Sequence, residues 1–200
     1  SKKVRDQLKL VVPNANTSLV YNGIEIDERL DLQLKPRYDK YVLYLGRLVA
    51  GKNLQTVILA FKKIASAMPD AKLIVAGDGP LRQEWQELVQ SNNLQKNVLF
   101  LGHISSRKDK YELLAQASAV VFPSISEGFA MVPIEAFHMA KPLLISDVRP
   151  SDEIVDDGVD GYLLPPYDED KWAEKILLVL DNPDKCKEMG NKGRRKVLET

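Results

Sequence analysis

The sequence of 200 residues lacks most features of disulfide-rich, membrane and nucleic-acid-binding proteins. Its single cysteine, Cys186, excludes an internal disulfide and fits a reducing compartment such as the cytoplasm. No apolar run is long enough to cross a bilayer, and no signal peptide is recognisable at the start. Because 28 Lys and Arg balance 28 Asp and Glu, the surface as a whole does not attract nucleic acid or anionic lipid.

The signatures of several enzyme classes are missing as well. Histidine, cysteine and acidic residues form no cluster at metal-ligand spacing, so we expect no metal site. The absence of a Gly-x-Ser-x-Gly elbow argues against a serine hydrolase. The segment Gly77-Asp-Gly-Pro80 has Arg82 in place of the third glycine of a dinucleotide fingerprint, and therefore indicates a tight strand-to-helix turn beside a ligand.

From residue 41 onward, short apolar runs alternate with amphipathic stretches. The runs predict strands at Tyr41–Leu45, Lys72–Ala76, Val98–Leu101, Ala119–Phe122, Leu143–Ser146 and Gly161–Leu164. Helical periodicity predicts helices at Asn53–Ala67, after Pro80, and at Lys108–Gln116, Pro133–Met139, Asp168–Leu180 and Pro183–Leu198, with one helical turn at Asp152–Val155. This alternation predicts an α/β fold: a Rossmann-like, doubly wound parallel sheet covered on both faces.

The first 40 residues do not follow this alternation. Val20–Ile24 predicts an edge strand with an Asn-Gly turn, and Arg29–Asp39 is polar and loop-like. The length suits one domain with a sizeable core. We therefore divide the chain into an interdomain or edge segment, residues 1–40, and one Rossmann-like domain, residues 41–200.

Glycines gather where the predicted strands end. In an open parallel sheet, ligands bind beyond the carboxyl ends of the strands. Gly46, Gly77, Gly102 and Gly128 all fall in segments that follow such ends. Glycine lets the backbone approach a ligand closely. Their convergence at one edge predicts a nucleotide-type ligand.

Two carboxylates, Glu127 and Glu135, flank a predicted helix start and are separated by seven residues. The backbone N–H groups of residues 129–132 suit a phosphate, as helix starts do. A carboxylate repels phosphate, so we expect these acids to accept hydrogen bonds from sugar hydroxyls, and the combination indicates a sugar nucleotide. As structural alternatives, Glu127 is an exposed loop acid and Glu135 serves the helix dipole; Val132 cannot supply the hydroxyl of a capping box.

Two cations follow the first predicted strand. Arg47 and Lys52 have the chemistry to grip a diphosphate and to neutralise charge that builds on a diphosphate leaving group. The alternative is two ordinary solvated side chains. His103 either faces a base or phosphate or is an ordinary loop histidine.

These segments together resemble the retaining glycosyltransferases of family 4, whose GT-B fold has two facing Rossmann-like domains. The resemblance covers almost the whole chain, as the carboxyl-terminal, donor-binding domain. The matching motifs are the family's NGI turn, its GRL…KN segment, its GxGP turn, the strand and loop beside the nucleobase, and its E-x7-E signature. In this sequence they are Val20–Glu25, Tyr44–Asn53, Val75–Leu81, Val98–Ile104 and Pro123–Glu135.

The resemblance implies a role for each matching residue. Arg47 and Lys52 would hold the diphosphate of a nucleoside diphosphate sugar, and Glu127 would lie beside the transferred sugar and the phosphates. Glu135 would bind the ribose hydroxyls, and the backbone near His103 would read the base. The implied donor-binding positions are Gly46, Gly77, His103, Ile104, Gly128, Phe129, Ala130, Met131, Val132 and Glu135.

The resemblance also implies the reaction. A UDP or GDP sugar would give its sugar to an acceptor hydroxyl with the anomeric configuration retained, without a metal or another cofactor. The acceptor, a glycan, lipid or small molecule, would bind an amino-terminal domain that this chain lacks. We therefore expect donor binding but almost no transfer from this domain alone. We expect a cytoplasmic protein with no nucleic-acid partner; peripheral membrane association of the parent stays open.

Two sites depart from the family's pattern. Ala130 replaces the last glycine of EGFG, which predicts crowding of the donor sugar. Arg149 and Pro150 stand where paired glycines are common, and the sequence gives no account of the consequence.

Two further functions stay open at this point. One is a related two-domain sugar-nucleotide epimerase, although its catalytic carboxylates and histidines are not obvious here. The other is a non-catalytic module of the same fold. The nucleobase, the sugar, the acceptor and the oligomeric state cannot be read from the sequence.

Overall fold

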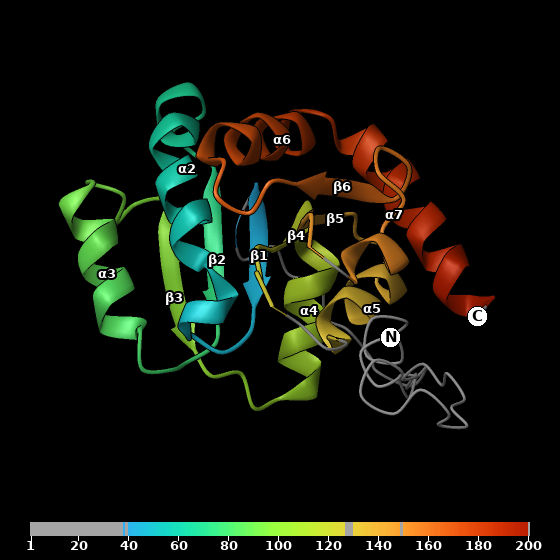
Figure 1. Ribbon diagram of the computed structural model, residues 1–200, viewed down its shortest axis with the longest axis horizontal. Helices are drawn as coiled ribbons and strands as arrows, with labels where there is room; N and C mark the ends of the chain where they lie inside the picture. The colour runs from blue at the N-terminus through green and yellow to red at the C-terminus, as the bar shows by residue number, and fades with distance from the viewer. Residues whose placement is uncertain (1–37, 39, 127–129, 149, 200) are drawn as a thin grey trace, which may run out of the picture.

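The structure, a computed structural model, describes residues 38, 40–126, 130–148 and 150–199. These residues contain one six-stranded parallel sheet with the strand order β3-β2-β1-β4-β5-β6 (Figure 1). The strands are β1 Tyr41–Leu45, β2 Lys72–Ala76, β3 Val98–Gly102, β4 Ala119–Phe122, β5 Leu143–Ser146 and β6 Gly161–Leu164. All the predicted strands are confirmed, and β3 extends one residue further than expected.

Helices connect successive strands and largely match the sequence prediction. Their bounds are α2 Leu54–Ala67, α3 Arg82–Ser91, α4 Arg107–Gln116, α5 Met131–His138, α6 Glu169–Asp181 and α7 Pro183–Leu198. Two 3-10 helices, η1 Ala50–Lys52 and η2 Ser151–Glu153, are short; the first was not expected. Helix α5 begins two residues before Pro133, because proline is compatible with the first helical turn.

The helices cover both faces of the sheet, as the doubly wound prediction requires. Alternate residues of β1 point to opposite faces. Val42 and Tyr44 pack in the core that contains residues of α2, α3 and α6. Leu43 and Leu45 pack in the core that contains residues of α4 and α5. Every residue of β1 is buried, which explains why its sequence is a continuous apolar run.

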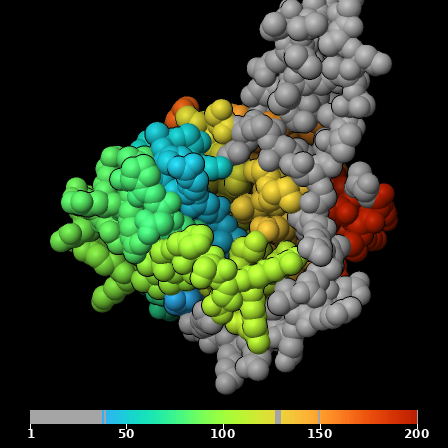
Figure 2. Space-filling view, turned by 90° about the horizontal axis from the view of Figure 1, so that it is seen from below, coloured from blue at the N-terminus to red at the C-terminus, as the bar shows by residue number. Residues whose placement is uncertain are grey.

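The strand order reverses between β1 and β4. From β1 the chain proceeds outward to β2 and β3, and it then returns to the other side of β1 to form β4. In folds of this kind the crevice at the reversal is the usual ligand site. Figure 2 shows this edge from below: cyan residues that follow β1 lie next to yellow and orange residues that follow β4.

Helix α7 runs along the β6 side of the molecule toward α5 (Figure 1). Gly193 permits this approach, because an added Cβ there would overlap the ring of Phe137 on α5. Near the carboxyl end of α7, Lys196 Nζ lies 2.8 Å from an Asp156 carboxylate oxygen and 2.9 Å from one of Asp160. In the part of the chain that the structure describes, every helix is too short or too polar to span a membrane.

Candidate functional site

Backbone hydrogen bonds join the turns that follow β1, β2 and β3. The Gly46 N–H donates to the Ala76 carbonyl at 3.1 Å, and the Gly77 N–H donates to the Gly102 carbonyl at 2.8 Å. The Leu48 N–H donates to the Asp78 carbonyl at 2.9 Å. These bonds fix the carboxyl edge of half the sheet before any ligand binds.

Glycine is required where the first two turns touch. A Cβ added to Gly77 would overlap the Gly46 carbonyl oxygen, and one added to Gly79 would lie 2.5 Å from the Leu48 carbonyl oxygen. Both contacts are with backbone, which cannot move aside as a side chain can. Gly46 and Gly77, predicted as ligand-contacting glycines, thus also have a packing role in the turn.

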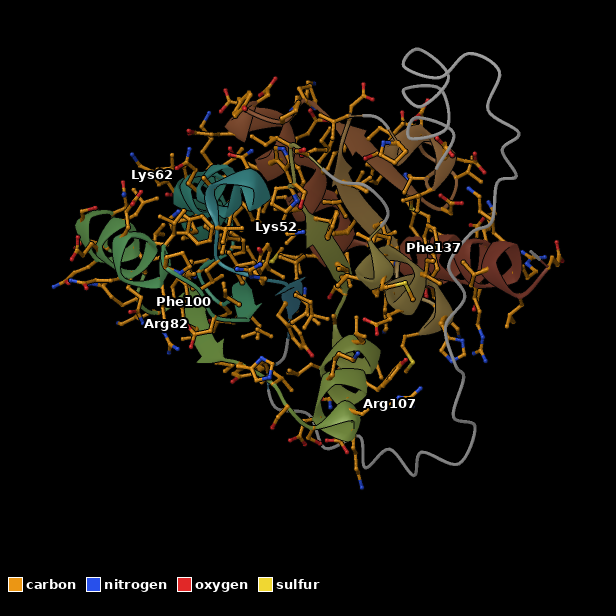
Figure 3. The ribbon with its side chains drawn as sticks, turned by 60° about the horizontal axis from the view of Figure 1, so that its bottom comes forward. Lys52, Lys62, Arg82, Phe100, Arg107 and Phe137 are labelled. Atoms are coloured by element: carbon orange, nitrogen blue, oxygen red, sulfur yellow. The ribbon has the colours of Figure 1, made fainter. Side chains whose placement is uncertain are left out.

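Arg47 and Lys52 lie in the loop that follows β1. Arg47 is exposed, between the fixed neighbours Gly46 and the fully buried Leu48. Lys52 is half-buried, and its ammonium lies 5.1 Å from the centre of the Phe122 ring, at the end of β4. Figure 3 shows Lys52 near the centre of the carboxyl edge, between α2 and β4.

A second contact joins the loops on the two sides of the reversal point. The Ile125 N–H, beyond β4, donates to the Gly51 carbonyl, beyond β1, at 3.0 Å. The structure therefore brings the Arg47–Lys52 loop and the loop of the E-x7-E segment together, although about 75 residues separate them in sequence. This is the juxtaposition that the sequence motifs predicted.

Helix α5 begins beside this contact. Ala130 is its N-cap residue, with φ −90° and ψ 139°. This is extended backbone that alanine adopts without strain, so the fold does not need glycine at this position. Met131 and Val132 occupy the first turn, where backbone N–H groups have no partner within the helix. Pro133 has no N–H, so the phosphate donors predicted from the sequence are Ala130, Met131 and Val132.

Glu135 lies just beyond the first turn of α5 and is largely buried, with a 13% exposed side chain. Its Oε1 accepts a hydrogen bond from Lys110 Nζ of α4 at 2.6 Å. The sequence analysis did not identify Lys110. No periodic or motif signal links the two residues, because the pair joins different helices and spans 25 positions.

The end of β3 is two strands away from β1, or about 10 Å at ordinary strand spacing. His103 is exposed there, and Ile104 is half-buried against the core on the α4 side. Asp78 accepts a hydrogen bond from the Gly79 N–H at 2.8 Å and pairs with Arg82 at 2.9 Å. The Gly79 N–H, together with Arg82, lowers the pKa of Asp78 from its usual value. The spacing from this end to β4 suits an elongated ligand.

Four residues singled out from the sequence, Glu127, Gly128, Phe129 and Arg149, lie outside the described residues. So does the predicted edge strand at Val20–Ile24. Within the described ranges, no three His, Cys, Asp or Glu side chains are grouped to hold a metal ion.

Other surface hollows suit a phosphorylated ligand less well. One of about 520 Å³ beside β3 is lined by glutamines and apolar residues, Phe100 among them (Figure 3). Another of about 550 Å³ is lined by residues 165–170, which include three acids, Asp168, Glu169 and Asp170. Acidic walls repel phosphate. The reversal point instead combines two cations with a helix start.

Comparison with protein families gives one matching family, described as Glycosyl transferases group 1, over residues 26–196. Among curated proteins, the chain is 31% identical over 206 residues to N-acetyl-alpha-D-glucosaminyl L-malate synthase of Bacillus anthracis. That alignment covers 98% of this chain and 52% of the relative. The chain thus spans about half the length of this relative.

Solved structures share the fold. TarM of S. aureus, in a complex with fondaparinux, alpha-GlcNAc-glycerol and UDP, aligns with a TM-score of 0.81 at 23% identity, over 98% of this chain and 39% of TarM. The C-terminal domain of the group 1 glycosyl transferase LpcC from Francisella tularensis aligns with a TM-score of 0.75 at 21% identity. That alignment covers 82% of this chain and 86% of the LpcC domain.

Proposed function

The chain belongs to the group 1 glycosyl transferases, and on this premise we propose that it is the carboxyl-terminal, donor-binding domain of a retaining, metal-independent enzyme of glycosyltransferase family 4. The likeness to a solved C-terminal domain over most of that domain's length supports this assignment. The whole enzyme would transfer a sugar from a nucleoside diphosphate sugar to an acceptor hydroxyl. The relative and the solved structures described above do not favour the epimerase.

One observation carries the proposal: the Gly51–Ile125 hydrogen bond, which closes the reversal point of the sheet. It brings Lys52 and the start of α5 to one place, with the exposed Arg47 on the same loop. Two cations and a first helical turn are the groups that bind a diphosphate. The donor would therefore lie along the carboxyl edge, with its diphosphate at β1 and β4 and its base toward β3.

Each group then has a task. The N–H groups of Ala130, Met131 and Val132, with Arg47 and Lys52, would bind the phosphates and stabilise the charge that builds on the leaving diphosphate. Glu135 would accept the ribose hydroxyls, and Glu127 would lie beside the transferred sugar. The backbone at His103 and Ile104 would contact the base. Departure and attack on the same face would retain the configuration, and the diphosphate would take the acceptor's proton.

UDP and GDP sugars are the proposed donors, with no further cofactor. An acceptor glycan, lipid or small molecule would bind the domain that the relatives' greater length implies. Closure of two domains would exclude water and align the reactants, so this domain alone should transfer almost nothing. The cytoplasmic location and the interdomain role of residues 1–40 stay predictions.

Calorimetry of this chain against UDP, GDP and ADP sugars tests the proposal. We expect measurable binding for one base class. Arg47→Ala should abolish it, whereas Arg194→Ala, an exposed arginine on α7, should leave it unchanged. No binding of any of the sugar nucleotides would favour the non-catalytic module. Unchanged affinity of Arg47→Ala would remove this residue from the site.

A further inference from the structure

The carboxylate of Glu135 faces a lysine from a different helix. Lys110 Nζ lies 2.6 Å from Glu135 Oε1, and their side chains are 28% and 13% exposed. A carboxylate this buried is costly to keep ionised without a partner. Lys110 is thus the counterion that lets Glu135 stay charged inside the protein.

Aromatic contact also restrains the Lys110 ammonium. It lies 5.3 Å from the centre of the Tyr111 ring, and Tyr111 is only 5% exposed. A cation over an aromatic face is attracted to it. The ammonium therefore has an anion and a ring as fixed neighbours, and both keep it at the junction of α4 and α5.

The pair leaves acceptor capacity on Glu135. Each carboxylate oxygen has two lone pairs, and the bond from Lys110 uses one on Oε1. The carboxylate can still accept bonds from two neighbouring hydroxyls. An isolated anion there would repel a diphosphate bound at the start of the same helix, whereas a neutral pair does not.

We propose that Lys110 is a positioning residue for ribose recognition. It orients the Glu135 carboxylate and compensates its charge, so that the carboxylate accepts the ribose hydroxyls of a nucleotide while the diphosphate lies nearby. This inference rests on the proposed function, because it needs a nucleotide at this site. A mere brace between α4 and α5 would affect stability and leave hydroxyl recognition intact.

The test measures how much the ribose 2′-hydroxyl contributes to binding. Dissociation constants of UDP and 2′-deoxy-UDP, and of GDP and 2′-deoxy-GDP, are measured calorimetrically for the unchanged chain and for Lys110→Met, Lys110→Arg and Glu135→Gln. In the unchanged chain, loss of the hydroxyl should weaken binding on the order of tenfold, as expected for a bond to a charged group. The ratio should fall to about twofold or less in Lys110→Met and Glu135→Gln, and Lys110→Arg should restore most of it.

Lys108→Met is the matched control, because it removes one positive charge from the same helix. It should keep the tenfold ratio. Lys110→Gln, which keeps a hydrogen-bond donor without the charge, replaces Lys110→Met if the latter unfolds the chain.

The outcomes separate the inference from the function. If the unchanged chain binds none of the nucleotides, the proposed function fails and the inference fails with it. If it binds them but the hydroxyl makes no difference, Glu135 does not bind the ribose. A ratio that falls in Glu135→Gln but persists in Lys110→Met and Lys110→Gln would leave the donor site standing and overturn the positioning role.

Discussion

The two halves of the sheet build the carboxyl edge differently. On the β3-β2-β1 side, the turns are joined by backbone hydrogen bonds and packed through glycine. On the other side, the α4 and α5 residues supply charged side chains, as in the Lys110–Glu135 pair. The contrast teaches that the first half is specified by shape and the second by charge. Substitutions in the first should impair folding, and those in the second should impair binding.

The largest effect is expected for Gly77→Ala, on the shape side. The added methyl group would overlap the Gly46 carbonyl oxygen, so the turn must shift. We expect a loss of about 3 kcal/mol in the free energy of unfolding, measured by urea denaturation.

Gly51→Ala is the control, since no described atom lies within 4 Å of its added Cβ. Its free energy of unfolding should stay within about 0.5 kcal/mol of the unchanged chain. Equal stability of the two variants would contradict the packing role of Gly77.

The next effect, on the charge side, is expected for Glu135→Gln. The amide keeps the shape but loses the anion that would accept ribose hydroxyls. Affinity for the preferred nucleoside diphosphate should fall by about 2 kcal/mol, because bonds to charged groups are stronger than neutral ones. Calorimetry measures the affinity, and a urea titration measures the accompanying stability. A variant that loses stability but binds the nucleotide normally would make Glu135 a structural residue.

A smaller loss of binding is expected for Lys52→Met. The variant keeps an apolar chain beside Phe122 but lacks the point charge over its ring. Affinity for the diphosphate should fall roughly tenfold, and the fall should shrink as salt rises. Lys62→Met, which changes an exposed lysine on α2 (Figure 3), should bind like the unchanged chain. Similar losses in both variants would indicate a diffuse charge effect instead of a contact.

The sequence predicted the shape side of this comparison well. The strands are buried on both faces, so their apolar runs are continuous and easily recognised. Strand ends then located Gly46, Arg47 and Lys52, because parallel strands bring their carboxyl ends to one edge.

The charge side was only partly predictable. Lys110 meets Glu135 through the packing of α4 against the same face as α5, and helical periodicity describes each helix alone. Asn53 was missed for the same reason. It adopts a left-handed conformation with φ 48°, and its amide donates to the Pro166 carbonyl, 113 residues away, at 2.7 Å.

The smallest expected effect concerns Asp160, away from the edge. Burial raises the pKa of Asp160, although Lys196 and the Asp156 N–H oppose the rise. A raised pKa in the folded chain means that the folded state holds the proton more tightly than the unfolded state. The contribution of this group to stability is therefore full below its unfolded pKa, about 3.8, and is lost as pH rises through its folded pKa.

Asp160→Asn should remove this pH dependence, whereas Asp156→Asn, at an exposed position, should retain it. Urea denaturation at a series of pH values from 3 upward measures the slope. The opposite sign, a gain of stability through Asp160 as pH rises, would show that Lys196 outweighs burial.

The most direct test of the central claim is a nuclear magnetic resonance titration of the isotope-labelled chain with UDP and with GDP. The account predicts that the preferred nucleotide moves amide signals at both sides of the reversal point, in Gly46–Lys52 and at Met131 and Val132, together with those of His103 and Ile104. Shifts confined to residues 165–170, or to the hollow beside β3, would contradict a diphosphate site at the reversal of the sheet.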